Sequence, residues 1–160
     1  MPAYVGVGSN VGEPEGQVRA ALAALAALPA TRLVATSPLY RTLPFGPVAQ
    51  DDFINAVAGL LTRLPAQDLF AALRAIETAQ GRVRTERWGP RTLDLDLLVY
   101  GSQRIDSAEL SVPHPGIAAR GFVLRPLADI APELQVPGVG RVADLLARLP
   151  GDGIVARVAA

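Results

Sequence analysis

The residues from Leu93 to Leu97 alternate strictly between leucine and aspartate, and this alternation constrains the fold more than any other feature of the chain. A period of two predicts a β-strand that directs Asp94 and Asp96 to one face and the leucines to the other. Two carboxylates on one face repel each other unless a cation lies between them. Oxygen ligands without a nearby cysteine favour Mg²⁺ over zinc. The alternative interpretation is an amphipathic strand with one wet face.

The segment before this strand is rich in arginine. Within Gly81–Leu98 lie the only tryptophan and four of the fifteen arginines, namely Trp88, Arg82, Arg84, Arg87 and Arg91. Guanidinium groups bind phosphate oxygens in a bidentate manner. Arginines upstream of a pair of magnesium ligands therefore predict a polyphosphate held between the two.

Composition excludes several classes of function. The 160 residues carry fifteen acidic and fifteen basic side chains, so there is no general attraction to nucleic acid or to an anionic membrane. All the basic residues are arginine, which excludes a P-loop lysine and a lysine Schiff base. The chain has no cysteine, no signal-peptide pattern and no segment of membrane-spanning length. We therefore expect a cytoplasmic enzyme or binding domain.

The periodicity of apolar residues predicts one α/β domain over residues 1–160. The expected strands are Ala3–Gly8, Thr31–Arg41 with a Ser-Pro break, Asp52–Thr62, Leu93–Tyr100, Arg104–Asp106 and Ile154–Val158. The expected helices are Pro14–Leu28, Pro65–Gln80 and Arg141–Leu149, with a short helical turn from Asp129. The main elements follow the order β-α-β-β-α-β.

Several other positions are candidates for ligand contacts. The Gly6–Gly12 segment resembles a dinucleotide fingerprint, but the displaced third glycine favours a plain tight turn. Asn55 shares a strand face with Phe53 and suits the amide edge of a heterocycle, although a surface polar residue is the alternative. Glu77 opposes the helix dipole in a last turn, which indicates a ligand or an arginine partner, although a solvated residue is the alternative. His114 is flanked by prolines, either as a structural residue or facing a ligand.

These motifs together resemble the 6-hydroxymethyl-7,8-dihydropterin pyrophosphokinase family of folate biosynthesis. The resemblance covers nearly the whole chain and rests on Gly8-Ser-Asn10, Tyr40-Arg-Thr42, Asn55, Glu77 with Arg82-x-Arg84, Arg87-Trp-Gly-Pro-Arg-Thr-Leu-Asp-Leu-Asp96, Val112-Pro-His114-Pro and Arg120-Gly-Phe122-Val. It implies a ferredoxin-like core with a mostly antiparallel sheet flanked by helices. It also implies transfer of a pyrophosphoryl group from ATP to the pterin hydroxymethyl oxygen, with release of AMP.

The resemblance assigns roles to individual residues. Asp94 and Asp96 would bind two Mg²⁺ ions, and Arg82 and Arg91 would act with them in catalysis. The residues expected at ATP are Glu77, Arg84, Trp88, Arg91, Leu97, Ser111, His114 and Arg120. The residues expected at the pterin are Thr42, Leu43, Phe45, Phe53, Asn55 and Phe122. ATP and the pterin are the expected partners of a monomer.

Three other functions remain as alternatives. A regulatory nucleotide-binding domain on the same fold would have lost the chemistry, which the intact Asp94, Asp96 and Arg91 argue against. An RNA-binding domain would need a basic sheet face with stacked aromatics, which a neutral chain argues against. A metal-dependent phosphohydrolase would share the paired acids, and it would release AMP without pterin.

Overall fold

The computed structural model describes residues 1–44, 50–80 and 93–158. The elements follow in chain order: β1 (Pro2–Ser9), α1 (Pro14–Ala26), β2 (Thr31–Thr36), β3 (Tyr40–Thr42), β4 (Phe53–Thr62), α2 (Ala66–Ala79), β5 (Asp94–Tyr100), β6 (Ile105–Asp106), β7 (Ser111–Val112), a 3₁₀ turn (Ile117–Ala119), α3 (Gly121–Ile130), β8 (Gln135–Val136), β9 (Gly140–Arg141), α4 (Val142–Ala147) and β10 (Ile154–Arg157).

The main sheet is antiparallel at every pairing, in the order β10-β3-β4-β1-β5, with β2 also paired to β4. The strands β1 and β4 are therefore central, and β5 lies at one end of the order. This arrangement confirms the predicted fold class, a ferredoxin-like core with a mostly antiparallel sheet and flanking helices.

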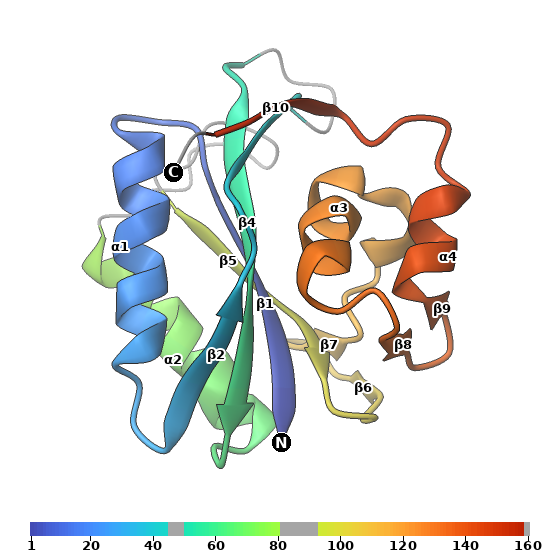
Figure 1. The fold of residues 1–160 in the computed structure, drawn as a ribbon. Coiled ribbons are helices and arrows are strands. Elements are labelled where there is room, and N and C mark those ends of the chain that lie inside the picture. Colours follow the sequence, from blue (N-terminus) through green and yellow to red (C-terminus); the bar gives the residue numbers. More distant parts are fainter. Residues whose placement is uncertain (45–49, 81–92, 159–160) are drawn as a thin grey trace.

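The two faces of the sheet are covered by different helices, α1 and α2 on one side and α3 and α4 on the other (Figure 1). Val5 and Val7 of β1 pack with Leu95 of β5 on the α1/α2 side. Val57 of β4 and Leu98 of β5 pack with α3 instead. The alternation of side chains along each strand thus divides the core in two.

The predicted strands and the first two long helices are confirmed, with bounds that shift by a few residues. The sequence analysis assigned no element to residues 121–128 and expected only a short helical turn from Asp129, so it missed the helix α3. Gly121 starts this helix and Pro126 lies inside it, and both residue types disfavour helix. Burial of Val123, Leu124 and Leu127 against the sheet outweighs that local preference.

The sequence predicts a short strand over Arg104–Asp106 as a partner of the strand before it; the strand occurs as β6, but the predicted pairing with β5 is wrong. Its partner is β7, through the pairs Ile105 with Val112 and Asp106 with Ser111. Ser111 is therefore held in a small separate ribbon, and the chain then leads to His114.

Candidate functional site

The candidate site lies on the α3 side of the sheet, where β1 ends and β4 and β5 begin. The strand register places Asn55, Gly8 and Asp94 side by side in one row across three strands. Gly6 and Asp96 lie side by side in the next row. Neighbouring strands are about 4.8 Å apart, so Asn55 and Asp94 stand about 10 Å apart with a glycine between them. Two glycines therefore form the floor between a polar amide and a pair of carboxylates.

Gly8 leaves room that a side chain would fill. A β-carbon at this position would overlap the Asn55 Oδ1 atom, which lies over the glycine. The Asn55 Nδ2 atom donates a hydrogen bond of 2.8 Å to the Thr42 hydroxyl, and both side chains are buried. This bond fixes the orientation of the amide and directs its acceptor oxygen over Gly8.

Asp94 and Asp96 are half-buried on the face opposite to Leu95. Burial, and next the charge of Asp94, raise the pKa of Asp96 to about 7, while Arg120 and Arg74 act in the opposite direction. A carboxyl group held in this way gains from a cation that offsets its desolvation and its neighbour's charge.

The donor set fits magnesium held together with a nucleotide. Within residues 1–44, 50–80 and 93–158, no three His, Cys, Asp or Glu side chains gather as ligands for one metal ion. Mg²⁺ in nucleotide sites characteristically takes one or two carboxylates, with phosphate oxygens and water as the remaining ligands. The pair Asp94 and Asp96 supplies that number of protein ligands.

Two predicted phosphate contacts flank the carboxylates on the α3 side. Arg120 directly precedes α3, and its guanidinium lies 5.8 Å from the ring centre of Phe122. His114 accepts a hydrogen bond from the Gly116 amide at Nδ1, at 3.2 Å. Burial, with the charge of Arg120, lowers the pKa of His114 to about 4. The ring is therefore neutral at pH 7 and carries its proton on Nε2.

The predicted pterin contacts come from the other end of the same row. Phe53 alternates with Asn55 and Val57 along β4, so it shares their face of the sheet. The Leu43 side chain is 57% exposed, and its amide donates to the Gly153 carbonyl at 2.9 Å, next to β10. The Leu43 amide therefore already has a partner within the protein.

The resemblance predicts that Glu77 and Leu97 contact the nucleoside. Leu97 lies on β5, and Glu77 lies on α2 with its side chain against β5. Glu77 is buried, and its Oε2 atom accepts a hydrogen bond of 2.8 Å from the Leu95 amide. The Leu97 side chain lies in the core with α1 and α2. Only its backbone is thus available for a ligand contact of the kind expected.

The motif Gly8-Ser-Asn10 has a structural role beside the floor. Ser9 donates to the Gln17 side chain at 2.7 Å, and Asn10 donates to the Asp51 carbonyl at 3.0 Å. These bonds tie the end of β1 to α1 and to the start of β4. The remaining predicted site residues, which are Arg82, Arg84, Trp88, Arg91 and Phe45, lie outside the described residues.

The sequence reading missed Arg74, which lies three residues before Glu77 on α2. Its Nη1 atom lies 2.8 Å from Glu77 Oε1, and its Nη2 atom donates to the Leu95 carbonyl at 2.7 Å. The i, i+3 spacing of opposite charges is visible in the sequence. The contact with β5 is not, because it depends on how α2 packs.

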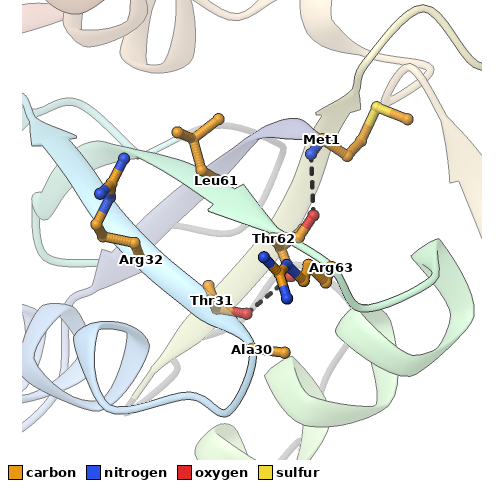
Figure 2. A pocket seen from close by; sticks show the side chains of 7 residues that line it. All are labelled: Met1, Ala30, Thr31, Arg32, Leu61, Thr62 and Arg63. Atoms are coloured by element: carbon orange, nitrogen blue, oxygen red, sulfur yellow. Dashed lines mark hydrogen bonds between the residues drawn. The ribbon is translucent and has the colours of Figure 1, made fainter.

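A separate cavity of about 510 Å³ opens at the far end of the sheet (Figure 2). It is lined by Met1, Ala30, Thr31, Arg32, Leu61, Thr62 and Arg63. The Met1 amino group there donates to the Thr62 carbonyl at 3.0 Å. Six residues of β1 separate this end from Gly8, a span of about 20 Å. The cavity is therefore distinct from the candidate site.

In the part of the chain that the structure describes, no helix has both the length and the apolar character needed to cross a bilayer.

Solved structures with the same fold include the Plasmodium falciparum HPPK-DHPS with pteroate, at a TM-score of 0.71 and 14% identity. An HPPK-DHPS in complex with substrates matches at a TM-score of 0.67 and 12% identity. The matches cover 92% and 91% of this chain but only 42% and 43% of those longer chains.

Curated relatives match over almost their entire length. The 2-amino-4-hydroxy-6-hydroxymethyldihydropteridine pyrophosphokinase of Pseudomonas aeruginosa is 55% identical over 151 residues, which are 94% of this chain and 93% of the relative. The protein of the same name from Haemophilus influenzae is 44% identical over 146 residues, or 91% of each chain. The family model of 7,8-dihydro-6-hydroxymethylpterin-pyrophosphokinase matches residues 4–132. The chain therefore belongs to the 7,8-dihydro-6-hydroxymethylpterin-pyrophosphokinase family.

Proposed function

We propose that this member of the family transfers the pyrophosphoryl group of ATP to the hydroxymethyl oxygen of 6-hydroxymethyl-7,8-dihydropterin, with Asp94 and Asp96 as ligands of two Mg²⁺ ions. The observation that carries the site assignment is the strand register, which sets Asn55, Gly8 and Asp94 in one row. A flat heterocycle over Gly8 would reach Asn55 with one edge and the carboxylate pair with its opposite substituent.

The pterin end of the row is built to accept hydrogen bonds. The Thr42 hydroxyl accepts a hydrogen bond from Asn55 Nδ2, so the Oδ1 atom is directed over Gly8 and would accept from the N–H donors of a pterin edge. Phe53 and Phe122 would stack on the two faces of the ring. The backbone of Thr42 and Leu43, together with Phe45, would close the outer side.

The ATP end combines a neutral donor with positive charge. His114 would donate from Nε2 to a phosphate oxygen, because its Nδ1 atom already accepts from Gly116. Arg120 would neutralise phosphate charge from the start of α3. In antiparallel strands successive residues direct their backbone groups to alternate sides, so those of Leu97, like those of Leu95, lie on the side away from β1. There the Leu97 backbone would contact the nucleoside, beside Glu77 and Ser111.

The remaining assignments rest on the resemblance alone. Arg82 and Arg91 would stabilise the transferring phosphoryl oxygens, and Arg84 and Trp88 would bind ATP. We also propose that residues 1–160 act as one pyrophosphokinase domain and as a monomer. Gel filtration with light scattering tests the oligomeric state.

The chemistry is chiefly positioning and charge stabilisation. The hydroxymethyl oxygen forms a bond to the β-phosphorus and its proton passes to solvent water, while the bond from that phosphorus to the α,β-bridging oxygen breaks and AMP leaves with that oxygen. Bound Mg²⁺ would supply Lewis-acid stabilisation of the phosphate charge. Asp94 and Asp96 would hold the Mg²⁺ charge in place. A carboxylate engaged as a metal ligand is a weak base for the hydroxyl proton.

The test is AMP formation from ATP and Mg²⁺ with and without 6-hydroxymethyl-7,8-dihydropterin. Pterin-dependent AMP, with the pyrophosphorylated pterin detected by mass spectrometry, is expected for the native chain. Asp96→Ala should abolish it, and Asp106→Asn, which changes an exposed aspartate of β6, should not. AMP or ADP without pterin would indicate a hydrolase, and ATP binding without turnover would indicate a regulatory domain.

A further inference from the structure

Strand β5 carries both carboxylates, and within the described residues it pairs only with β1. Backbone groups of alternate residues along such a strand face away from its partner. Leu95 lies between Asp94 and Asp96, and its backbone groups face that outer side, where they meet side chains instead of another strand. The peptide groups around Leu95 therefore control how the two aspartates are presented.

Two side chains of α2 take the place of a neighbouring strand. Glu77 Oε2 accepts from the Leu95 amide at 2.8 Å, and Arg74 Nη2 donates to the Leu95 carbonyl at 2.7 Å. The backbone amide and carbonyl of Leu95 are thus both bound by side chains, the amide by Glu77 and the carbonyl by Arg74. We call Arg74 and Glu77 the α2 fork.

The α2 fork is itself held tightly. The Arg74 Nη1 atom lies 2.8 Å from Glu77 Oε1, and the Glu77 side chain is only 3% exposed against 35% for Arg74. The Arg74 guanidinium also lies 4.8 Å from the centre of the Phe70 ring. The planar guanidinium can meet a carboxylate and a carbonyl at once, which an ammonium group cannot do in a fixed geometry.

The surroundings make this polar network an exception. The same face of α2 is otherwise apolar, with Leu69, Leu73 and Ile76 in the core. A buried ion pair seldom adds stability over an apolar pair of equal size. Its presence here, on the one residue between two functional carboxylates, indicates a role in geometry.

We propose that Arg74 and Glu77 are positioning residues that fix the separation and direction of the Asp94 and Asp96 carboxylates through the backbone of Leu95. This inference rests on the proposed role of the two aspartates as metal ligands. The repulsion between them would push the start of β5 out of register, and the two hydrogen bonds to Leu95 oppose that movement.

The test uses variants that remove the α2 fork without leaving one buried charge alone. Arg74→Met/Glu77→Leu removes both charges together, so a folded protein is expected. Arg74→Lys keeps the charge but loses the planar geometry. Arg19→Met is the matched control, because Arg19 pairs with Glu15 over one helical turn of α1 at 3.1 Å, and both side chains are about half exposed.

The first readout needs no metal and no activity. Amide hydrogen exchange at Leu95, measured by NMR on the metal-free protein, should be at least about tenfold faster in the double variant than in the native chain. The second readout is Mn²⁺ binding followed by electron paramagnetic resonance, with and without ATP. Loss of groups that orient metal ligands typically weakens binding by about 10- to 100-fold, and we expect a change in that range.

The kinetic readout separates positioning from general damage. The kcat should fall in the double variant and less in Arg74→Lys, while the KM for the pterin stays within about twofold, because Asn55 lies two strands away. Faster exchange at Leu95 with unchanged Mn²⁺ affinity in a folded double variant would overturn the inference, as would equal losses in Arg19→Met. The proposed function fails separately, through absence of pterin-dependent AMP in the native chain.

Discussion

The two faces of the sheet use neighbouring residues of the same strands for opposite purposes. Toward α1 and α2, β1 presents Val5 and Val7, and β5 presents Leu95, all with at most 1% exposure. Toward α3, the intervening positions near the site are Gly6, Gly8 and a pair of aspartates. One face is filled with apolar side chains, and near the site the other carries glycines and carboxylates, which suit the ligands proposed above. The comparison teaches that stability and chemistry here are separated by one residue along a strand.

The strongest test of this separation substitutes two adjacent residues of β5, Asp96 and Leu95, one at a time. Asp96→Asn should lower turnover by about 10³-fold or more, because a metal ligand contributes several kcal/mol to stabilising the transition state. Its free energy of unfolding should not fall, since the substitution relieves repulsion with Asp94.

The adjacent substitution Leu95→Ala should chiefly lower the stability of the fold, whereas Asp96→Asn chiefly lowers turnover. Truncation of a fully buried leucine costs about 2–5 kcal/mol of stability. Urea unfolding of the metal-free proteins measures both variants. A large loss of stability in Asp96→Asn would contradict the division of the two faces.

Arg74 is a polar exception on the apolar face and sharpens the comparison. Arg74→Met removes the ion pair that Arg74 makes with the buried Glu77 carboxylate, and we expect a loss of about 3 kcal/mol in the free energy of unfolding. Arg141→Met is the control, because Arg141 pairs with Glu133 and Asp144 on the surface and exposed pairs contribute little. Equal effects in urea unfolding would show that burial of Glu77 does not matter.

The glycine floor predicts a smaller effect confined to one substrate. Gly8→Ala adds a methyl group where Asn55 Oδ1 lies, so the amide must move away from its bond with Thr42. We expect the KM for the pterin to rise about tenfold, as for one lost hydrogen bond of about 1.4 kcal/mol. The KM for ATP should change little.

Gly6→Ala provides the comparison for this prediction. A β-carbon there would lie 3.6 Å from the Leu98 side chain, an ordinary contact distance. Steady-state kinetics on both variants decides the point. A pterin KM that rises equally in both variants would mean that the row through Asn55 has no special role.

His114 gives an effect that depends on pH, and its sign is fixed by the lowered pKa. The folded pKa of about 4 lies below the ordinary 6.5, so the unfolded chain binds more protons between these values. His114 therefore stabilises the fold above pH 6.5 and loses that contribution as the pH falls toward 4. The loss is at most about 1.4 kcal/mol per pH unit.

His114→Asn is the matched variant, since its Oδ1 atom can replace Nδ1 as acceptor for Gly116 but does not titrate. As the pH is lowered, the free energy of unfolding of the native chain should fall relative to that of the variant. Urea unfolding at pH 7, 5.5 and 4.5 measures it. A difference independent of pH would show that the ring is not held neutral.

Local patterns predicted most of the fold. Alternating and continuous apolar runs predicted the strands of the sheet, and the helix predicted over Pro65–Gln80 is α2. The helix α3 was not predicted, because Gly121 and Pro126 disfavour a helix locally. The free energy that stabilises it comes from packing on β4. The buried Val123, Leu124 and Leu127 do follow helical spacing, but the glycine and the proline argue against a helix when the sequence is considered alone.

The candidate site was predictable by composition but not by arrangement. The alternation in Leu93–Leu97 predicted that Asp94 and Asp96 share a face, and β5 confirms the strand. That Gly8 lies between Asn55 and Asp94 depends on pairing across three strands far apart in the chain. The contact of Arg74 with Leu95 likewise depends on the docking of α2, which sequence spacing does not contain.

The α2 fork also bears on how the molecule avoids other copies of itself. A seven-residue strand at the end of a sheet offers backbone groups that can recruit a strand from another chain and begin aggregation. Glu77 and Arg74 bind the amide and the carbonyl of Leu95, the second residue of β5. The side chains that we infer to position the metal ligands thereby also block edge-to-edge pairing, so their loss should appear as concentration-dependent association as well as lost turnover.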